Sequence, residues 1–347
     1  MEDALAGPAQ NEIATRSGLW EATGRFRRNP IAMAAAAVFV LLVVLSLLAP
    51  YYAHNVAREN PFLTNVNGTT VINGKRVSVL QPSSGPLHLG ETPIGPTWDI
   101  RNYFLGADGY GRDVAALVLY GGRTSLEIGL ASAGVCCGIA LIFALISGFY
   151  GGGIDWLFSR VSDLIWAMPV YMLAISIGTV LITAPHGLQL GPINITADSV
   201  WLPILLIGFI YIPYAFRPIR AAVLTVRRRE FIDAAISQGA GDARLIIREV
   251  MPNVLNVVIV LFPLLVATNI LTESALSFLG IGVQPPNVSW GTLIADGQTL
   301  LYTRPWVTLA PGFMIVVAVL ALNLVGDGLR DALDPKGNYR LRRVGQR

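Results

Sequence analysis

Long stretches without a charged residue alternate with shorter polar segments along most of the chain. A helix needs about 20 residues to cross a hydrocarbon core about 30 Å thick, so an uncharged window of at least about 18 residues indicates a membrane span. Each span is expected to be helical, because lipid offers no partner to a free backbone amide or carbonyl. The six stretches that qualify are 31–50, 128–150, 164–184, 199–216, 250–272 and 305–326.

Glycine and proline interrupt this pattern. A seventh uncharged stretch, 274–295, contains three glycines and the pair Pro285 and Pro286, so we expect a loop or a re-entrant segment there instead of a continuous helix. Pro169 and Pro263 fall inside predicted spans, where proline removes a backbone hydrogen bond and kinks a helix. Such kinks either frame a cavity or are ordinary features of a membrane bundle.

The composition also indicates a membrane protein. Hydrophobic residues make up 53% of the 347-residue chain and charged residues only 14%, whereas soluble domains carry about 25% charged residues. The formal net charge of +3 is small, and no nucleic-acid partner is expected. The only cysteines, Cys136 and Cys137, are adjacent, which excludes a disulfide scaffold and a CxxC site. The histidines His54, His88 and His186 lack metal-ligand spacing, so no metal site is expected.

Basic residues orient the predicted spans. An even number of spans places both termini on one side of the membrane, and lysine and arginine are enriched in short cytoplasmic segments. Of the 25 basic residues, 18 lie on the termini and on the loops of the same side, whereas Arg304 alone lies in a short loop of the other side. We therefore expect both termini to be cytoplasmic.

The predicted spans divide the chain into segments. These are a cytoplasmic N-terminus (1–30), the first span (31–50), an exterior insert (51–123), a five-helix core (124–326) that contains a cytoplasmic hairpin (217–252), and a cytoplasmic C-terminus (327–347). The insert is too long for a simple connection and is expected to fold. In it, two β-prone runs within 69–79 flank Asn73-Gly74, which predicts a β-hairpin. The insert is either a contact surface for an extracellular partner or a cap on the bundle.

The most informative segment is cytoplasmic and covers 217–253. Residues 230–238 suit a short helix, because polar and small residues recur in it at helical spacing. One face of this helix carries Glu230, Asp233, Ala234 and Ser237. A short surface helix with small residues suits insertion into a groove of a partner protein.

Two glycines are predicted to end that short helix. Gly239 and Gly241 interrupt the pattern, Asp242 is placed to cap a second helix, and Pro252 lies where the first turn of the fifth span tolerates proline. The result is a helix-turn-helix lying across the membrane face. By composition alone, a solvated connector and a docking element are both open. The length of the segment, its small residues and its specified turn favour docking.

This segment resembles a known loop. It reads DAAISQGA from Asp233 and has Pro252 thirteen residues after Gly239, which is similar to the EAA loop of binding-protein-dependent ABC importers. In that family the loop is the coupling-helix segment by which a membrane subunit docks on its ATPase. Asp233 takes the place of the glutamate, and Glu249 and Met251 depart from the isoleucine and leucine near the end. The residues expected at the ATPase joint are Glu230, Asp233, Ala234, Ala235, Gly239, Ala240, Asp242 and Pro252.

Four further blocks resemble the dipeptide, oligopeptide and nickel permease family, and specifically its C-type subunit. They are LGADGYGRDVAALVLYGGRTSLEIGL from Leu105, GFYGGGIDWLFSRVSDLIWAMP from Gly148, ESALSFLGIGVQPPNVSWGTLIADG from Glu273 and LNLVGDGLRDALDPK from Leu322. The resemblance implies an all-α polytopic membrane protein with six transmembrane helices, the type I ABC importer permease fold. It also implies a bacterial inner-membrane complex with a homologous B-type permease subunit, two cytoplasmic ATP-binding subunits and an extracytoplasmic substrate-binding protein.

The chain has no nucleotide-binding motif of its own. A P-loop needs GxxxxGK[ST], and neither Lys75 nor Lys336 lies in such a sequence. ATP and magnesium are therefore expected on the partner ATPases, no cofactor is expected in this chain, and the chain is expected to be non-catalytic. An intramembrane enzyme is further disfavoured, because GxSxG and HExxH are absent from the sequence.

Charges near the spans disfavour a gradient-driven carrier, because a proton or sodium relay usually needs a carboxylate near the middle of the membrane. Glu127 and Glu273 are predicted at exterior span ends, and Asp155, Asp163 and Asp327 at cytoplasmic ends. Glu273 and Asp163 match family positions, and ties between helices are favoured there over substrate contacts. The expected function is ATP-driven import of dipeptides or oligopeptides. The alternatives are nickel import by the same machinery and, less favoured, a gradient-driven carrier.

Overall fold

The computed structural model describes residues 22–72, 74–82, 90–184, 188–190 and 193–333. Within them, four helical segments are long and apolar enough to cross a membrane alone, and two bent pairs pass the same test together. Counting each bent pair as one span gives six spans, as the sequence predicts. The four are α2 (Pro30–Leu47), α4 (Val114–Tyr150), α11 (Met251–Phe278) with the turns that precede it from Asp242, and α13 (Trp306–Leu333).

The bent pairs break where the sequence removes a backbone donor. Helix α5 (Gly152–Trp166) and helix α6 (Val170–Thr183) meet at 89°, and Pro169 is the N-cap of α6, so the predicted kink at this proline is confirmed. Helix α7 (Trp201–Ile210) and helix α8 (Ile212–Arg227) meet at 47°, and a proline lies in the first turn of α8. Pro263, the other predicted kink, lies inside α11 without ending it.

Several helices run past the uncharged windows used to predict them. Helix α4 starts at Val114, because Asp113 caps it by accepting hydrogen bonds from the amides of Ala115 and Ala116. The last ten residues of the predicted exterior insert, 51–123, are therefore helical and belong to α4. Helix α8 continues to Arg227 and helix α13 to Leu333, well beyond the predicted span ends at 216 and 326. A charged residue ends an uncharged stretch of sequence, but it does not have to end the helix that contains that stretch.

Helix α4 is the central helix and packs against α8 and α11. Small residues on α4 allow close approach: Ala133, Cys136 and Ala140 are fully buried, and a side chain at Gly148 would collide with Val223 of α8. Both cysteines are free thiols buried in this core. The apolar core therefore follows α4 along the bundle.

The predicted β-hairpin is present in the insert. Strands β1 (Thr69–Ile72) and β2 (Lys75–Ser78) pair antiparallel, with Ile72 opposite Lys75, which leaves two residues of sequence between the paired strands. Gly74 has φ of +77°, as such a turn requires, whereas residue 73 lies outside the described residues. Two other short antiparallel pairs are β3 (Leu80–Pro82) with β4 (Glu91–Pro93) and β5 (Leu188–Leu190) with β6 (Ile193–Ile195).

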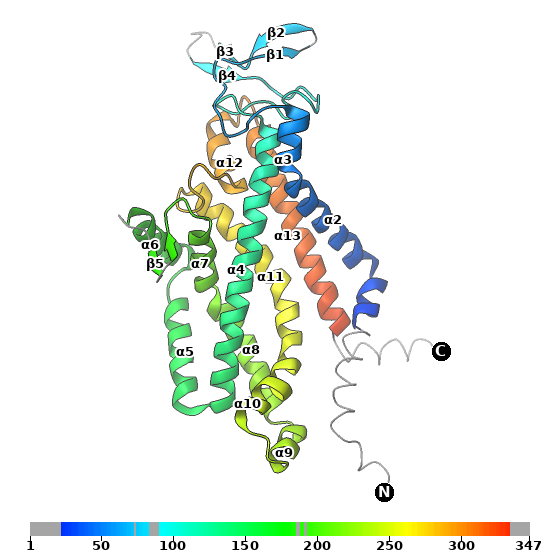
Figure 1. Ribbon diagram of the computed structural model, residues 1–347, viewed down its shortest axis with the longest axis vertical. Helices are drawn as coiled ribbons and strands as arrows, with labels where there is room; N and C mark the ends of the chain where they lie inside the picture. Colours follow the sequence, from blue (N-terminus) through cyan, green and yellow to red (C-terminus); the bar gives the residue numbers. More distant parts are fainter. Residues whose placement is uncertain (1–21, 73, 83–89, 185–187, 191–192, 334–347) are drawn as a thin grey trace.

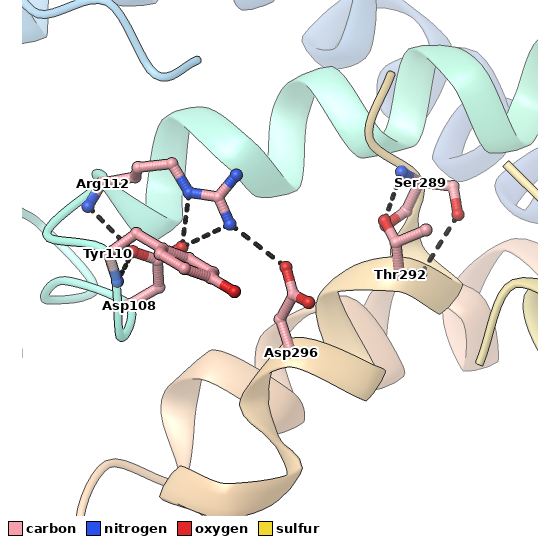
Figure 2. Close-up of polar contacts among 6 residues, drawn as sticks. All are labelled: Asp108, Tyr110, Arg112, Ser289, Thr292 and Asp296. Carbon is pink, nitrogen blue, oxygen red and sulfur yellow. Dashed lines mark hydrogen bonds and ion pairs between the residues drawn. The ribbon is translucent and has the colours of Figure 1, made fainter. Parts of the chain in front are cut away.

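The prediction that the seventh uncharged stretch, 274–295, is not a continuous helix is confirmed. This stretch contains the last turn of α11, a turn region and then α12 (Trp290–Gly297), which is followed by the 3-10 turn η4 (Gln298–Leu300). Ser289 and Thr292 form a capping box at the start of α12, each side chain bonding to the backbone of the other residue (Figure 2). This short helix packs on α13, α11 and α4.

The elongated bundle has two distinct ends (Figure 1). Strands β1 to β4, the short helix α3 (Ala49–Tyr51) and α12 lie at one end, called here the strand end. The short helices α9 (Glu230–Ser237) and α10 (Asp242–Arg244) project at the opposite end, called here the α9 end. Helix α2 begins and helix α13 finishes toward the α9 end, so the first and last spans run in opposite directions.

Candidate functional site

The predicted coupling residues lie on a turn at the α9 end of the molecule (Figure 1). The residues from the list that are exposed are Glu230, Asp233, Ala234, Gly239 and Asp242. Ala235, Ala240 and Pro252 are partly buried, so none of the eight lies fully buried between membrane helices. Helix α9 matches the predicted 230–238 helix to within one residue. The turn is therefore accessible to another protein.

Gly239 ends α9 with the hydrogen bonds of a glycine-terminated helix. Its φ is +80°, a left-handed backbone conformation that residues other than glycine rarely adopt. The Ala240 amide donates to the Ala235 carbonyl at 3.1 Å, and the Gly239 amide donates to the Ile236 carbonyl at 2.9 Å. These two bonds satisfy carbonyls that the end of a helix leaves free. The chain direction after α9 is thus specified locally.

One fully buried side chain anchors α9 to the bundle, and Phe231 and Ala235 pack beside it while partly buried. Ile232 is 1% exposed and belongs to the main apolar core together with Val223 of α8 and Val250. Ile236, one turn later, is 53% exposed and points away from that core. Helix α9 is therefore attached along one edge, and its other faces, which carry Asp233 and Ala234, stay open.

Asp242 does not cap the second helix, and that prediction was wrong. The N-cap of α10 is Gly241, no side chain caps this helix, and Asp242 is its first residue. A carboxylate in the first turn still interacts favourably with the positive end of the helix. The chain then continues through the π-helical turn η3 (Leu245–Val250) into α11, with Pro252 in the first turn as predicted.

No ion pair within the described part of the chain uses the carboxylates of Glu230, Asp233 or Asp242. Ser237 donates its hydroxyl to the Asp233 backbone carbonyl at 2.9 Å, which leaves the Asp233 carboxylate to solvent. Arg244, on α10, is also exposed. The turn thus offers charges of both signs for contacts with another polypeptide.

Two arginines of α8 tie it to α5 close to this turn. Arg220 pairs through two nitrogens with both carboxylate oxygens of Asp155. Arg217 pairs with Asp163 at 2.9 Å, and its guanidinium lies 4.3 Å from the centre of the Trp166 ring. The sequence favoured an interhelical tie for Asp163. It did not identify Arg217 as the partner, because no sequence spacing relates α5 to α8.

A small cavity lies beside these ion pairs. Its volume is about 210 Å³. Its lining residues are Ser159, Ser162, Asp163, Phe216, Arg217 and Arg220. Because α8 leads directly into α9, these polar contacts connect the turn to α5.

Glu273 forms a second tie, near the strand end. It is fully buried in α11 and accepts hydrogen bonds from Ser125 of α4 at 2.8 Å and from Ser277 at 2.7 Å. The Ser125 hydroxyl in turn accepts from the amide of Trp290, the first residue of α12. The three helices α4, α11 and α12 therefore meet at one carboxylate, as expected for an interhelical tie.

A third polar cluster joins the insert to α12 (Figure 2). Arg112 bonds Asp108 at 2.6 Å and Asp296 of α12 at 3.1 Å, and its guanidinium also lies 4.9 Å from the Tyr110 ring centre. Asp108 accepts hydrogen bonds from the amides of Tyr110 and Arg112 as well. Burial raises the pKa of the Asp296 carboxyl, against the lowering effect of Arg112. Sequence reasoning did not identify this bridge.

The described residues contain no group of three or more histidine, cysteine, aspartate or glutamate side chains suited to hold a metal ion. His54 lies on the surface next to α3, whereas His88 and His186 lie outside the described residues.

Models of two protein families match the chain. Residues 140–338 match the model described as binding-protein-dependent transport system inner membrane component. Residues 18–67 match the model described as N-terminal TM domain of oligopeptide transport permease C. The first match contains the α9 turn and more than half of the chain.

Curated relatives agree with these matches. The chain is 30% identical to the dipeptide transport system permease protein DppC of Alkalihalophilus pseudofirmus over 95% of its own length and 93% of the relative. It is 31% identical to the oligopeptide transport system permease protein OppC of Bacillus subtilis, over 96% and 95% of the two chains. It is 35% identical to OppC of Mycobacterium bovis, over 93% and 96%.

Proposed function

Because the chain belongs to the family of binding-protein-dependent transport system inner membrane components, we propose that it is the membrane-spanning subunit of an ATP-driven peptide importer. It pairs with a homologous B-type permease subunit to enclose the translocation pathway. Two cytoplasmic ATP-binding subunits bind ATP and magnesium, and an extracytoplasmic binding protein delivers the substrate. The chain lies in a bacterial inner membrane with both termini and the α9 end cytoplasmic.

The observation that carries this proposal is the attachment of α9. It is held by Ile232 on one edge, it is open on the faces with Asp233 and Ala234, and Gly239 specifies its turn. A docking helix needs these properties, because a partner must reach its side chains while its position relative to the bundle stays fixed. A solvated connector needs none of them.

The connections of the turn indicate how a push on α9 would reach the membrane. On one side α9 follows α8, which bonds to α5 through Arg220 and Arg217. On the other side α10 and η3 run into α11, which bonds to α4 through Glu273 and Ser125. Closure of the ATP-binding subunits would move the turn, and the turn would tilt α8 and α11 together as rigid bodies. Alternating access follows from that tilt.

Peptides are the proposed cargo because the relatives named above are dipeptide and oligopeptide permeases. The substrate itself is expected to be selected largely by the binding protein. Uptake assays with labelled dipeptides, longer peptides and nickel ions would separate these cargoes. Peptide uptake is the expected result, and uptake of nickel alone would replace peptides in the proposal.

The test is copurification combined with transport. The chain, extracted in mild detergent from its natural host, should bring ATP-binding subunits with it, and uptake into vesicles should need ATP when ion gradients are collapsed. Asp233→Arg should abolish both without preventing membrane insertion. Uptake that follows an ion gradient and ignores ATP would contradict the proposal.

A further inference from the structure

A loop at the strand end exposes two large apolar side chains. It comprises residues 97–103 and is called here the Trp98 loop. The side chains of Trp98 and Ile100 are each 59% exposed, and the two residues lie two positions apart on the same loop. Asp99 lies between these two residues, and Arg101 follows Ile100. The loop therefore presents both apolar and charged groups.

The Trp98 loop is closed by backbone hydrogen bonds, although it is neither helix nor strand. The amides of Thr97 and Trp98 donate to the carbonyls of Tyr103 and Phe104, both at 3.3 Å, and the Asn102 amide donates to the Asp99 carbonyl at 3.0 Å. These bonds hold Trp98 at φ of +59°, a left-handed conformation that is rare for a bulky residue. Such strain persists where the placement of a side chain matters.

Trp98 continues an apolar stripe on the outside of the last span. Its ring meets the ring of Trp306 edge to face, with centroids 5.7 Å apart, and Trp306 is the first residue of α13. Exposed apolar residues then recur down α13 at helical spacing. They are Trp306, Leu309, Phe313, Val316, Leu320 and Leu324. In a chain that crosses the membrane, this stripe faces lipid, so Trp98 lies directly beyond its end.

The first span makes the same connection from the other side. The hydroxyl of Tyr52, just after α3, donates to the backbone carbonyl of Ile100 at 3.1 Å. The neighbouring Tyr51 is exposed, as are Leu47 and Leu48 at the end of α2. Helices α2 and α13 pack against each other. The Trp98 loop thus sits over the strand-end termini of two lipid-facing helices.

We propose that the Trp98 loop is an interfacial anchor, with Trp98 and Ile100 inserted among the phospholipid headgroups at the strand end. Its backbone is not helical, so it cannot lie in the hydrocarbon, where unpaired amides and carbonyls are costly. Headgroup depth fits both the aromatic ring, which is favoured at that level, and the charges of Asp99 and Arg101, which stay hydrated there. The anchor fixes the insert relative to the membrane surface.

Spin labels at single introduced cysteines test this proposal. Trp98→Cys is labelled in the full-length chain, which is reconstituted into phosphatidylethanolamine and phosphatidylglycerol vesicles, and collisions with oxygen and with a water-soluble nickel chelate are compared. Lys75→Cys, exposed in the β1–β2 hairpin, is the control at the same end. The chain without an introduced cysteine is treated with the same label, to determine the background labelling of the buried Cys136 and Cys137. Ile100→Cys is labelled and measured in the same way, and it carries the test alone if Trp98→Cys does not fold.

The expected result is a ratio of oxygen to nickel-chelate collisions at positions 98 and 100 at least about threefold higher than at position 75. Equal ratios at all three positions would overturn the proposal. It would also be overturned if positions 98 and 100 lost access to the chelate only after the extracytoplasmic binding protein was added, since the loop would then be a protein docking surface.

Discussion

The backbone amide of Ala240 donates a hydrogen bond to the carbonyl oxygen of Ala235, with nitrogen and oxygen 3.1 Å apart. This bond closes the turn after α9 around Gly239, whose positive φ makes the closure possible. Both alanines also pack against the main apolar core. The exposed face of α9 is therefore oriented by the backbone at its end as well as by Ile232.

Gly239→Ala should loosen this turn. Nothing lies within 4 Å of the added carbon, so the cost is the left-handed conformation, about 1–2 kcal/mol. Amide exchange at Ala240 should accelerate about tenfold, which corresponds to about 1.4 kcal/mol, and ATP-dependent uptake should fall. Gly241→Ala is the matched control, because Gly241 has φ of −78° and equally open surroundings. Equal exchange rates in the two variants would argue against a conformational role for Gly239.

Ile232→Ala should detach α9 from the bundle. Removing most of a fully buried isoleucine costs about 2–5 kcal/mol, and the other apolar contacts of α9 with the core, through Phe231 and Ala235, are only partly buried. Limited tryptic cleavage at the exposed Arg228 and Arg229 should become about tenfold faster or more. The reason is that α9 would detach from the bundle more often and expose this backbone to the protease. Ile236→Ala removes the same atoms from an exposed position and should leave the cleavage rate unchanged.

The pair of Arg220 and Asp155 should transmit motion from α8 to α5. Arg220→Asp places two carboxylates together, and uptake should fall by about tenfold if the pair contributes about 1.4 kcal/mol to coupling. Adding Asp155→Arg restores opposite charges and should recover most of the uptake. Arg160→Asp reverses an exposed arginine of α5 as a control. A double variant as defective as Arg220→Asp alone would show that the pair does not act as a unit.

Asp113 should make stability depend on pH. Burial raises the pKa of this carboxyl from 3.8 to about 6, the bonds from the Ala115 and Ala116 amides oppose the rise, and nearby Glu59 adds to it. Because the folded state then binds more protons than the unfolded state between about pH 4 and 6, the contribution of Asp113 to stability falls as pH rises through that window. At neutral pH the charged group costs up to about 3 kcal/mol.

Asp113→Asn keeps an oxygen to cap α4 and removes that charge. The thermal midpoint of the reconstituted chain should rise by several degrees at pH 7 and should change less between pH 4 and 6 than that of the unmodified chain. Asp242→Asn, at an exposed position, serves as the control. A variant whose midpoint is lower at pH 7 would show that the carboxylate is favourable in the folded state.

Local features of this chain were predictable from its sequence. The helix at α9, the turn at Gly239, the β-hairpin and the break at Pro169 each depend on a few adjacent residues with strong backbone preferences. Asp242 was misplaced by one position, because Gly241 adopts the extended conformation of the N-cap and leaves the aspartate inside the helix.

Contacts between distant segments were not predictable in the same way. Arg112 reaches Asp296 across 184 residues of sequence, and Arg220 reaches Asp155 across 65. A single sequence contains no periodicity that relates such positions. The early start of α4 was missed because a hydropathy window measures the apolar layer, whereas Asp113 determines where the helix begins.

A photo-reactive amino acid in place of Ala234 tests the central claim most directly. Ala234 lies on the exposed face of α9, and the same substitution at Lys75, at the strand end, is the control. Illumination of the intact complex in membranes should crosslink position 234 to an ATP-binding subunit and position 75 to none. Addition of ATP should change the yield at position 234 if the joint moves during the cycle. Crosslinks from position 234 only to this chain, or to lipid, would contradict the assignment of α9 as the coupling helix.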